Sequence, residues 1–230
     1  MNYQESGRNT GKMRYLSNGE KVPFRCRLCG ECCRQVKDAV MLEPMDLYNL
    51  SRFLRERGAP IDSPDCLMDE YAHSLYIPDG YPFVVLNTMG TNDSCVFLKD
   101  GRCSVYAARP RVCRLYPFGV APGSNGREFC YYLCTEKQHH FGNGAVRTGD
   151  WLSDNFPREE REYLKADYQF LAEIGKAVRR MGEIQFRKNL FPFLYYRYFN
   201  YELDRPFLPQ YFKNTEALRN LFKKIDGGTT

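Results

Sequence analysis

The sequence predicts an α-rich α+β fold: an irregular, metal-stapled cysteine-cluster domain with a short β-hairpin and a helical C-terminal extension. Three observations support this prediction. All ten cysteines lie between residues 26 and 134, two β-prone runs flank a turn signal inside that stretch, and the pattern is helical from about residue 150 onward. The chain is therefore expected to have a flexible N-terminal arm (1–20), a cysteine-cluster metal-binding domain (21–149) and a helical, aromatic-rich extension packed on it (150–230).

Composition and charge narrow the class of protein. The chain has 230 residues, of which 43% are hydrophobic and 27% are charged, and this is enough for a sizeable core. A net charge of +5 permits contact with nucleic acid but does not argue for it, so we do not expect a nucleic-acid partner. Residues 1–20 are polar and do not resemble a secretion signal, and no window approaches the roughly 18 apolar residues of a membrane span. We expect a cytoplasmic protein without a membrane partner.

The cysteines are then expected to bind metal. In a reducing compartment, clustered cysteines hold metal or perform redox chemistry more often than they form disulfides. Cysteines that serve only as small core residues would be scattered along the chain, whereas the sequence has none after Cys134. Disulfides and core thiols remain the alternatives, and the clustering favours metal.

The first regular elements are a helix and a strand. The stretch Glu43–Asp46 opens a helix, because proline suits the first helical position and acidic residues suit the N-terminal end. Leucines at helical spacing mark its apolar face, and Gly58 fits its C-terminal end. Residues 82–87 (PFVVLN) are expected to form a short buried strand.

The stretch CRLCGECC carries the first group of candidate ligands. Cys26, Cys29 and Cys32 have the two-residue gaps of bacterial-type iron–sulfur sites, whereas a zinc ion usually takes its cysteines in two separate pairs. This spacing favours an iron–sulfur cluster over zinc. Neighbouring side chains rarely converge on one ion, so we expect Cys33 to face away from Cys32 and to join thiolates from residues 95–134.

The second group lies in residues 95–118, where a hairpin is expected around Lys99-Asp100-Gly101. A two-residue Asp-Gly turn would pair Leu98 with Cys103 and leave Cys95 and Cys103 on opposite faces. A three-residue loop would pair Phe97 with Cys103 and place the two cysteines on one face, as a shared metal would require. Both alternatives stay open at this point. Cys113 is expected on a helical turn that follows Arg109-Pro110.

Several other residues are candidates for the site. Arg109 and Arg114 flank Cys113, where guanidinium groups can offset thiolate charge or bind a carboxylate or phosphate; ordinary ion pairs are the alternative. Cys130, His139 and His140 can each complete a metal site, although solvated loop residues are the simpler interpretation of the histidines. Cys66 has no second ligand nearby in the sequence and is expected to bind nothing. No residue is assigned a catalytic role.

Together, CRLCGECC, the pattern C-x7-C-x2-Y-x2-RP-x2-CRLYPF and a late cysteine resemble the YkgJ-type cysteine cluster family. That family is described as a zinc- or iron-chelating domain with a CxxCxxCC signature, and the resemblance covers roughly residues 24–152. It implies a set of eight metal ligands: Cys26, Cys29, Cys32, Cys33, Cys95, Cys103, Cys113 and Cys134. Some members are labelled flagellin lysine N-methylase, so the resemblance also implies S-adenosylmethionine and a protein or peptide substrate.

The chain itself shows no familiar methyltransferase site. Gly119–Gly126 and Gly142–Gly144 are expected to be ordinary loops, because neither follows the strand-turn-helix pattern of a cofactor turn. The aromatic-rich run 189–212 is expected to pack in a core, although it could stack bases or engage a partner. We therefore expect a cysteine-ligated metalloprotein, with an iron–sulfur cluster favoured over zinc, that modifies a protein or peptide. The alternative is a non-catalytic metal-binding module that engages a protein partner.

Overall fold

The computed structural model describes residues 13–17, 19–76, 81–123 and 128–227. The chain divides into two compact units. The first unit comprises the chain up to residue 34 together with residues 98–103 and 111–169; the second comprises residues 35–97, 104–110 and 170 onward. Within the described residues, no helix has both the length and the apolar character needed to cross a membrane. The three-part division at residues 20 and 149 stays a prediction.

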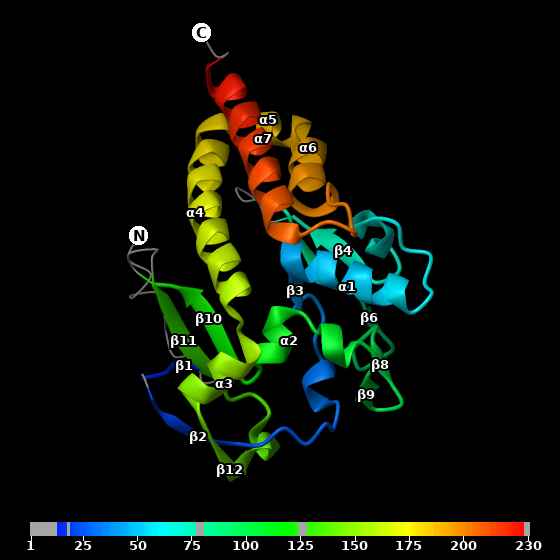
Figure 1. Cartoon of the computed structure of the whole chain (residues 1–230), viewed down its shortest axis with the longest axis vertical. Coiled ribbons are helices and arrows are strands. Elements are labelled where there is room, and N and C mark those ends of the chain that lie inside the picture. The colour runs from blue at the N-terminus through cyan, green and yellow to red at the C-terminus, as the bar shows by residue number, and fades with distance from the viewer. Residues whose placement is uncertain (1–12, 18, 77–80, 124–127, 228–230) are drawn as a thin grey trace. The chain divides into compact units, whose positions relative to one another are not determined.

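The predicted helix-rich α+β class is confirmed, with small antiparallel sheets and a helical C-terminal region (Figure 1). The helices are α1 (Pro44–Glu56), α2 (Arg111–Leu115), α3 (Thr148–Asn155), α4 (Arg158–Met181), α5 (Glu183–Lys188), α6 (Leu190–Leu194) and α7 (Phe207–Gly227). Shorter helical turns are η1 (Glu31–Cys33), η2 (Pro64–Leu67), η3 (Tyr106–Ala108), η4 (Gln138–His140) and the π-helical η5 (Tyr195–Phe199).

The first unit contains three small sheets. One has the order β1-β11-β10, from β1 (Met13–Tyr15), β11 (Phe129–Cys134) and β10 (Phe118–Pro122). The second pairs β2 (Lys21–Phe24) with β12 (Phe141–Arg147), and the third pairs β8 (Leu98–Lys99) with β9 (Arg102–Cys103). Residues 13–15 fall within the arm that the sequence predicts to be flexible, yet they pair with β11. A strand of only three exposed residues is too short for its pattern in the sequence to predict it.

Parts of the two glycine stretches expected to be loops, residues 119–122 and 142–144, are strands. Gly119 belongs to β10, and a Cβ atom there would lie 2.1 Å from the Tyr132 ring, so glycine lets that ring cross the neighbouring strand. Gly142 and Gly144 lie in β12, whose register shifts between Phe141 and Val146. The loop prediction was wrong at Gly119, where a close ring contact requires glycine, and at Gly142 and Gly144, because a bulged strand contains glycine as readily as a loop does. Residues 124–127 lie outside the described residues.

A small core holds the first unit together. Val22 and Phe24 from β2 pack with Phe118 and Leu133 from the other sheet. The Phe24 ring meets the Trp151 ring edge-on, with centroids 5.5 Å apart. Because Phe24 is buried here, the cysteine-bearing segment that follows it starts from a fixed point.

The predicted β8–β9 hairpin is confirmed, and its register decides between the two turn alternatives. Leu98 pairs with Cys103 and Lys99 with Arg102, which leaves the two-residue turn Asp100-Gly101. Both turn residues have positive φ, +50° and +73°, as a type I′ turn requires. The three-residue loop does not form.

Gly30 seats the CRLCGECC segment against this hairpin. Its φ is +72°, and a Cβ atom at this position would lie 2.5 Å from the carbonyl oxygen of Gly101 and 2.9 Å from a methyl carbon of Leu98. Only glycine allows so close an approach of two backbones. The cysteines that follow Gly30 are thereby held beside the hairpin that carries Cys103.

We expect Gly30→Ala to destabilise the first unit by about 2 kcal/mol or more, because strain and backbone overlap add together. Gly58→Ala is the matched control: its φ is +85°, but a Cβ atom there meets nothing within 4 Å. Urea unfolding and metal content of both variants measure the difference. Equal losses in the two variants would show that the contact of Gly30 with the hairpin does not matter.

The second unit has two sheets and the predicted helix α1. The sheet β3-β5-β4 joins β3 (Met41–Leu42), β5 (Phe83–Leu86) and β4 (Ala72–Leu75), and β6 (Thr88–Met89) pairs with β7 (Ser94–Cys95). The predicted strand and helix are confirmed. Glu43 caps α1 in a reciprocal capping box with Asp46, and Gly58 follows its end with positive φ.

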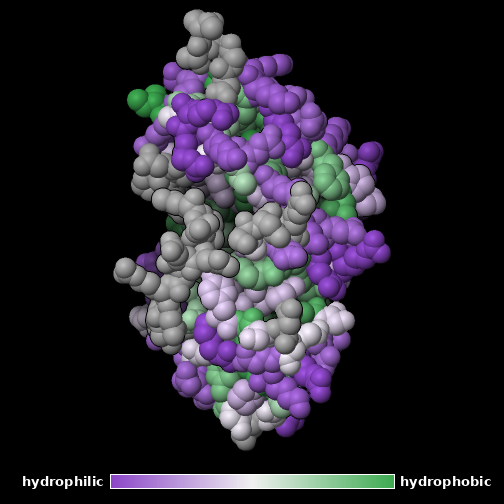
Figure 2. All heavy atoms as spheres, turned by 90° about the vertical axis from the view of Figure 1, so that its left-hand side faces the viewer, coloured by the Kyte–Doolittle hydropathy of each residue, from purple (hydrophilic) through white to green (hydrophobic). Residues whose placement is uncertain are grey.

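Aromatic side chains build the core of the second unit. Phe170, Phe186, Phe193 and Phe222 form one buried cluster with aliphatic neighbours from α4 and α7. The run 189–212 packs in this unit in large part, while some of its rings stay exposed. Figure 2 shows hydrophilic side chains over most of the described surface on one face, with smaller hydrophobic patches between them.

Candidate metal centre

The CRLCGECC segment follows β2 and ends in the single turn η1. Leu28 and Gly30 both have positive φ, so the backbone of this segment is irregular at two of three successive residues. Cys29 and Cys32 are exposed and Cys33 is half-buried. All ten cysteines of the chain are among the described residues, and none of them forms a disulfide bond.

Three thiols from three elements of the first unit act on the Cys33 thiol. Cys32 and Cys33 come from η1, Cys103 from the end of β9 and Cys113 from α2; we call these four residues the thiolate cluster. The Sγ atoms of Cys32 and Cys33 lie 3.9 Å apart. Hydrogen bonding with Cys103 and Cys32, burial, and the charges of Cys32 and Cys113 together raise the pKa of the Cys33 thiol.

This arrangement has the chemistry of a metal site. Thiols packed so closely resist ionisation, because each new negative charge lies beside another, and a bound cation removes that repulsion. A tetrahedral ion with metal–sulfur bonds of about 2.3 Å holds its sulfurs about 3.8 Å apart. The observed 3.9 Å between Cys32 and Cys33 fits ligands of one ion.

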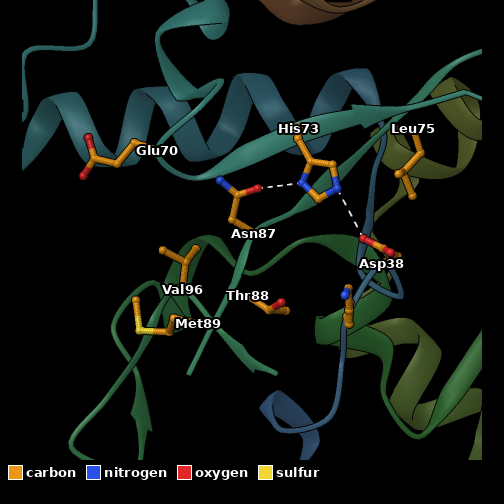
Figure 3. Close-up of a pocket in the computed structure, with 9 residues that line it drawn as sticks. Asp38, Glu70, His73, Leu75, Asn87, Thr88, Met89 and Val96 are labelled. Atoms are coloured by element: carbon orange, nitrogen blue, oxygen red, sulfur yellow. Dashed lines mark hydrogen bonds and ion pairs between the residues drawn. The ribbon is translucent and has the colours of Figure 1, made fainter. Parts of the chain in front are cut away.

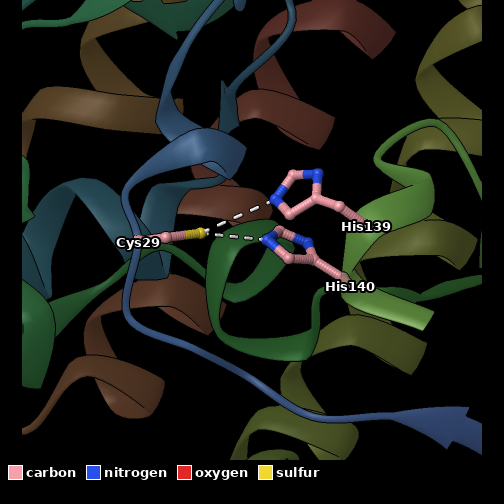
Figure 4. Close-up of side chains that lie close together, drawn as sticks. All are labelled: Cys29, His139 and His140. Atoms are coloured by element: carbon pink, nitrogen blue, oxygen red, sulfur yellow. Dashed lines mark hydrogen bonds between the residues drawn. The ribbon is translucent and has the colours of Figure 1, made fainter. Parts of the chain in front are cut away.

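A second group of donors combines one thiol with two imidazoles. The Cys29 Sγ atom lies 3.1 Å from Nε2 of His140 and 3.8 Å from Nε2 of His139. The three donor atoms all lie within 4.8 Å of one another. Figure 4 shows both rings, carried by η4, directed at the sulfur on the N-terminal segment. We call these three residues the mixed site.

Tyr116 holds one imidazole of the mixed site. Its hydroxyl forms a 3.1 Å hydrogen bond with Nδ1 of His140. Burial raises the pKa of Tyr116, and the charges of Cys134 and Cys32 add to the effect. Burial likewise lowers the pKa of His140, with the His139 charge as the next cause. Both groups are therefore neutral near pH 7, as a metal-binding imidazole must be.

The other candidate cysteines have different surroundings. Cys95 is buried in β7 of the second unit. Cys134 ends β11, while Cys130 of the same strand lies 3.5 Å from the carbonyl oxygens of Ala121 and Pro122. Cys66 lies 3.5 Å from the Ser63 hydroxyl, which lowers its pKa. The ligand roles inferred from the sequence stay predictions, including those of Cys26, Cys95 and Cys134 and the absence of one for Cys66.

The two arginines that flank Cys113 have protein partners. Arg114 donates to the carbonyl oxygen of Asn155 at 2.9 Å and forms an ion pair with Glu160. Arg109, a residue of the second unit, donates to the carbonyl oxygen of Tyr106 and lies 3.6 Å above the Tyr106 ring. These contacts favour the interpretation of Arg114 as a structural ion pair. A role of either arginine toward a cofactor or substrate stays a prediction.

We expect Arg114→Ala to lower the free energy of unfolding by about 2 to 3 kcal/mol, because it removes an ion-pair partner of a buried carboxylate. The Glu160 side chain is only 6% exposed. Arg158→Ala is the control, since Arg158 pairs with Glu162 at the surface and such pairs contribute about 0.5 kcal/mol or less. Chemical denaturation compares the two; a loss as small as that of the control would mean that Arg114 is not structural.

A pocket in the second unit is lined by residues other than the cysteines described above. It has a volume of about 490 Å³, and its lining includes Lys37, Asp38, Glu70, His73 and Asn87. Figure 3 shows the His73 ring between two oxygen acceptors: Nδ1 lies 2.6 Å from Oδ1 of Asn87 and Nε2 lies 3.2 Å from Oδ1 of Asp38. Both ring nitrogens are thus engaged within the protein, so the imidazole positions its neighbours.

Comparison with known proteins agrees with the cysteine pattern. Residues 25–131 match the family model CxxCxxCC, described as "Putative zinc- or iron-chelating domain". The chain is similar to an uncharacterized protein of Methanocaldococcus jannaschii, with 29% identity over 101 residues. The aligned stretch covers 43% of this chain and 47% of that protein. The chain therefore spans about half the length of this curated relative. No solved structure matches the chain.

Proposed function

We propose, on the premise that residues 25–131 carry a CxxCxxCC domain, that the chain is a metal-binding protein whose thiolate cluster holds a single ion of the zinc type. One observation carries this proposal: the Cys33 thiol forms hydrogen bonds with Cys32 and Cys103, and the charge of Cys113 also acts on it. Four thiolates complete the tetrahedral shell of a structural zinc site and leave no position for a substrate. The ion would join η1, β9 and α2, which are short elements of 3, 2 and 5 residues.

The separation of the adjacent cysteines supports one ion over a cubane cluster. In a cubane each thiolate binds a different iron, so its sulfurs lie farther apart than ligands of a single ion. Cys32 and Cys33 lie 3.9 Å apart, and we therefore propose that they share an ion, against the expectation that they face different centres.

An iron–sulfur cluster is the second candidate. The two-residue gaps between Cys26, Cys29 and Cys32 favour it. Such a cluster would be required for the modification of a protein or peptide with S-adenosylmethionine as a cosubstrate. That activity is inferred from family resemblance. A closed four-thiolate site supports the non-catalytic module instead. Its protein partner would contact the exposed aromatic surface of the second unit, where the rings of Phe191 and Tyr195 stack with centroids 6.1 Å apart.

Metal and acid-labile sulfide analysis of protein purified without oxygen tests the proposal. We expect zinc, or iron without sulfide, and about one ion fewer per chain in Cys33→Ser than in the natural chain. Acid-labile sulfide in an amount equal to that of iron would contradict the single ion and support an iron–sulfur cluster. A chain that binds neither metal would contradict both candidates.

A further inference from the structure

We propose that Cys29, His139 and His140 form a second metal site, which binds one divalent ion of the zinc class and keeps one coordination position open. The inference goes beyond the proposed function, because it needs no ion in the thiolate cluster. Both histidines also lie beyond residues 25–131, so the match to the family model does not supply them.

The distances between the donor atoms suit one ion. A tetrahedral zinc with bonds of about 2.3 Å to sulfur and about 2.0 Å to nitrogen separates these ligands by about 3.5 Å. The two sulfur–nitrogen distances, 3.1 Å and 3.8 Å, lie on either side of this value. A rotation of the exposed Cys29 or His139 side chain would equalise them.

The surroundings of His140 position its Nε2 atom toward the site. A histidine that binds metal through one ring nitrogen usually donates its other N–H to a fixed acceptor. Here the Tyr116 hydroxyl lies 3.1 Å from Nδ1 and can accept that hydrogen bond. The edge contact with the Phe24 ring, at 6.2 Å between centroids, restrains the imidazole further. Tyr116 is therefore a positioning residue of the site.

The difference in burial among the three residues explains the open position. His140 is 5% exposed, whereas Cys29 and His139 are exposed. Three protein ligands with one side toward solvent leave room for a water molecule or another small ligand, as in zinc sites that exchange a ligand. The thiolate cluster, with four sulfurs, has no such position. The chain would then carry one structural ion and one accessible ion.

Metal titration of the full chain with Co²⁺ and Zn²⁺ tests the site. We expect His139→Ala and His140→Ala each to bind one ion fewer than the natural chain and to lose the cobalt absorption of the mixed site. Tyr116→Phe should keep the ion with about 10- to 100-fold weaker affinity. Cys66→Ser and His73→Ala are controls outside the mixed site and should titrate as the natural chain does.

The outcomes separate the two sites. Because His139 is exposed, its variant is expected to fold, and circular dichroism checks this. One ion lost in Cys33→Ser and a different ion lost in His139→Ala would support both sites. A loss in His139→Ala alone would support the mixed site and contradict the thiolate cluster. Unchanged stoichiometry and affinity in the folded His139→Ala and His140→Ala proteins would overturn the mixed site, whatever Cys33→Ser shows.

Discussion

Replacing Cys33 with serine is expected to remove the ion of the thiolate cluster and to unfold the elements that the ion joins. Binding of structural zinc contributes roughly 10 kcal/mol to the folding of small zinc-finger peptides at neutral pH. Even a fraction of that would exceed the cost of an ordinary core substitution, and we expect a loss of more than about 3 kcal/mol. Metal content and the midpoint of chemical denaturation measure the two effects.

Cys66→Ser is the matched control for this variant. Cys66 is an exposed thiol in η2 of the second unit, and the sequence predicts that it binds nothing. The control should keep its full metal content and its midpoint. A Cys33→Ser protein with the same metal content as the control would show that the ion is held elsewhere.

Removal of metal by a strong chelator under reducing conditions should have the second largest effect. We expect amide exchange to rise toward unfolded rates over residues 26–34, 98–103 and 111–115, because these short segments have few backbone partners of their own. The core around Phe186 and Phe222 in the second unit should keep its protection, since it is built from packed aromatic rings.

Hydrogen exchange followed by mass spectrometry, with and without the chelator, makes this comparison within one molecule. The second unit serves as the internal control. Unchanged exchange over residues 98–103 would mean that the β8–β9 hairpin is stable without metal. A rise of equal size in α7 would instead indicate global unfolding.

Local signals in the sequence were enough to predict several elements. Glu43-Pro44 and Gly58 marked the ends of α1, because caps and left-handed glycines act within a few residues. The hairpin was predicted as well, but its register was left open between two turns. The choice depended on whether Asp100 adopts a positive φ, and aspartate tolerates this conformation without requiring it.

The sequence did not predict which distant segments lie side by side. The cysteine pattern predicted a metal-binding region, but not that Cys29 would lie beside His140, 111 positions away. That contact depends on β2 and β12 pairing across a bulge, a feature without a local signature. The pair His139-His140, five residues past Cys134, was the only signal, and on its own it favoured solvated loop residues.

X-ray absorption spectroscopy at the edge of the bound metal tests the central claim most directly. The claim predicts sulfur neighbours at about 2.3 Å, with nitrogen at about 2.0 Å from the mixed site, and no second metal nearby. In His139→Ala the nitrogen contribution should fall while the sulfur shell stays. A short iron–iron distance together with bridging sulfide would contradict the claim, because the thiolates would then hold a cluster of several metals and not a single ion.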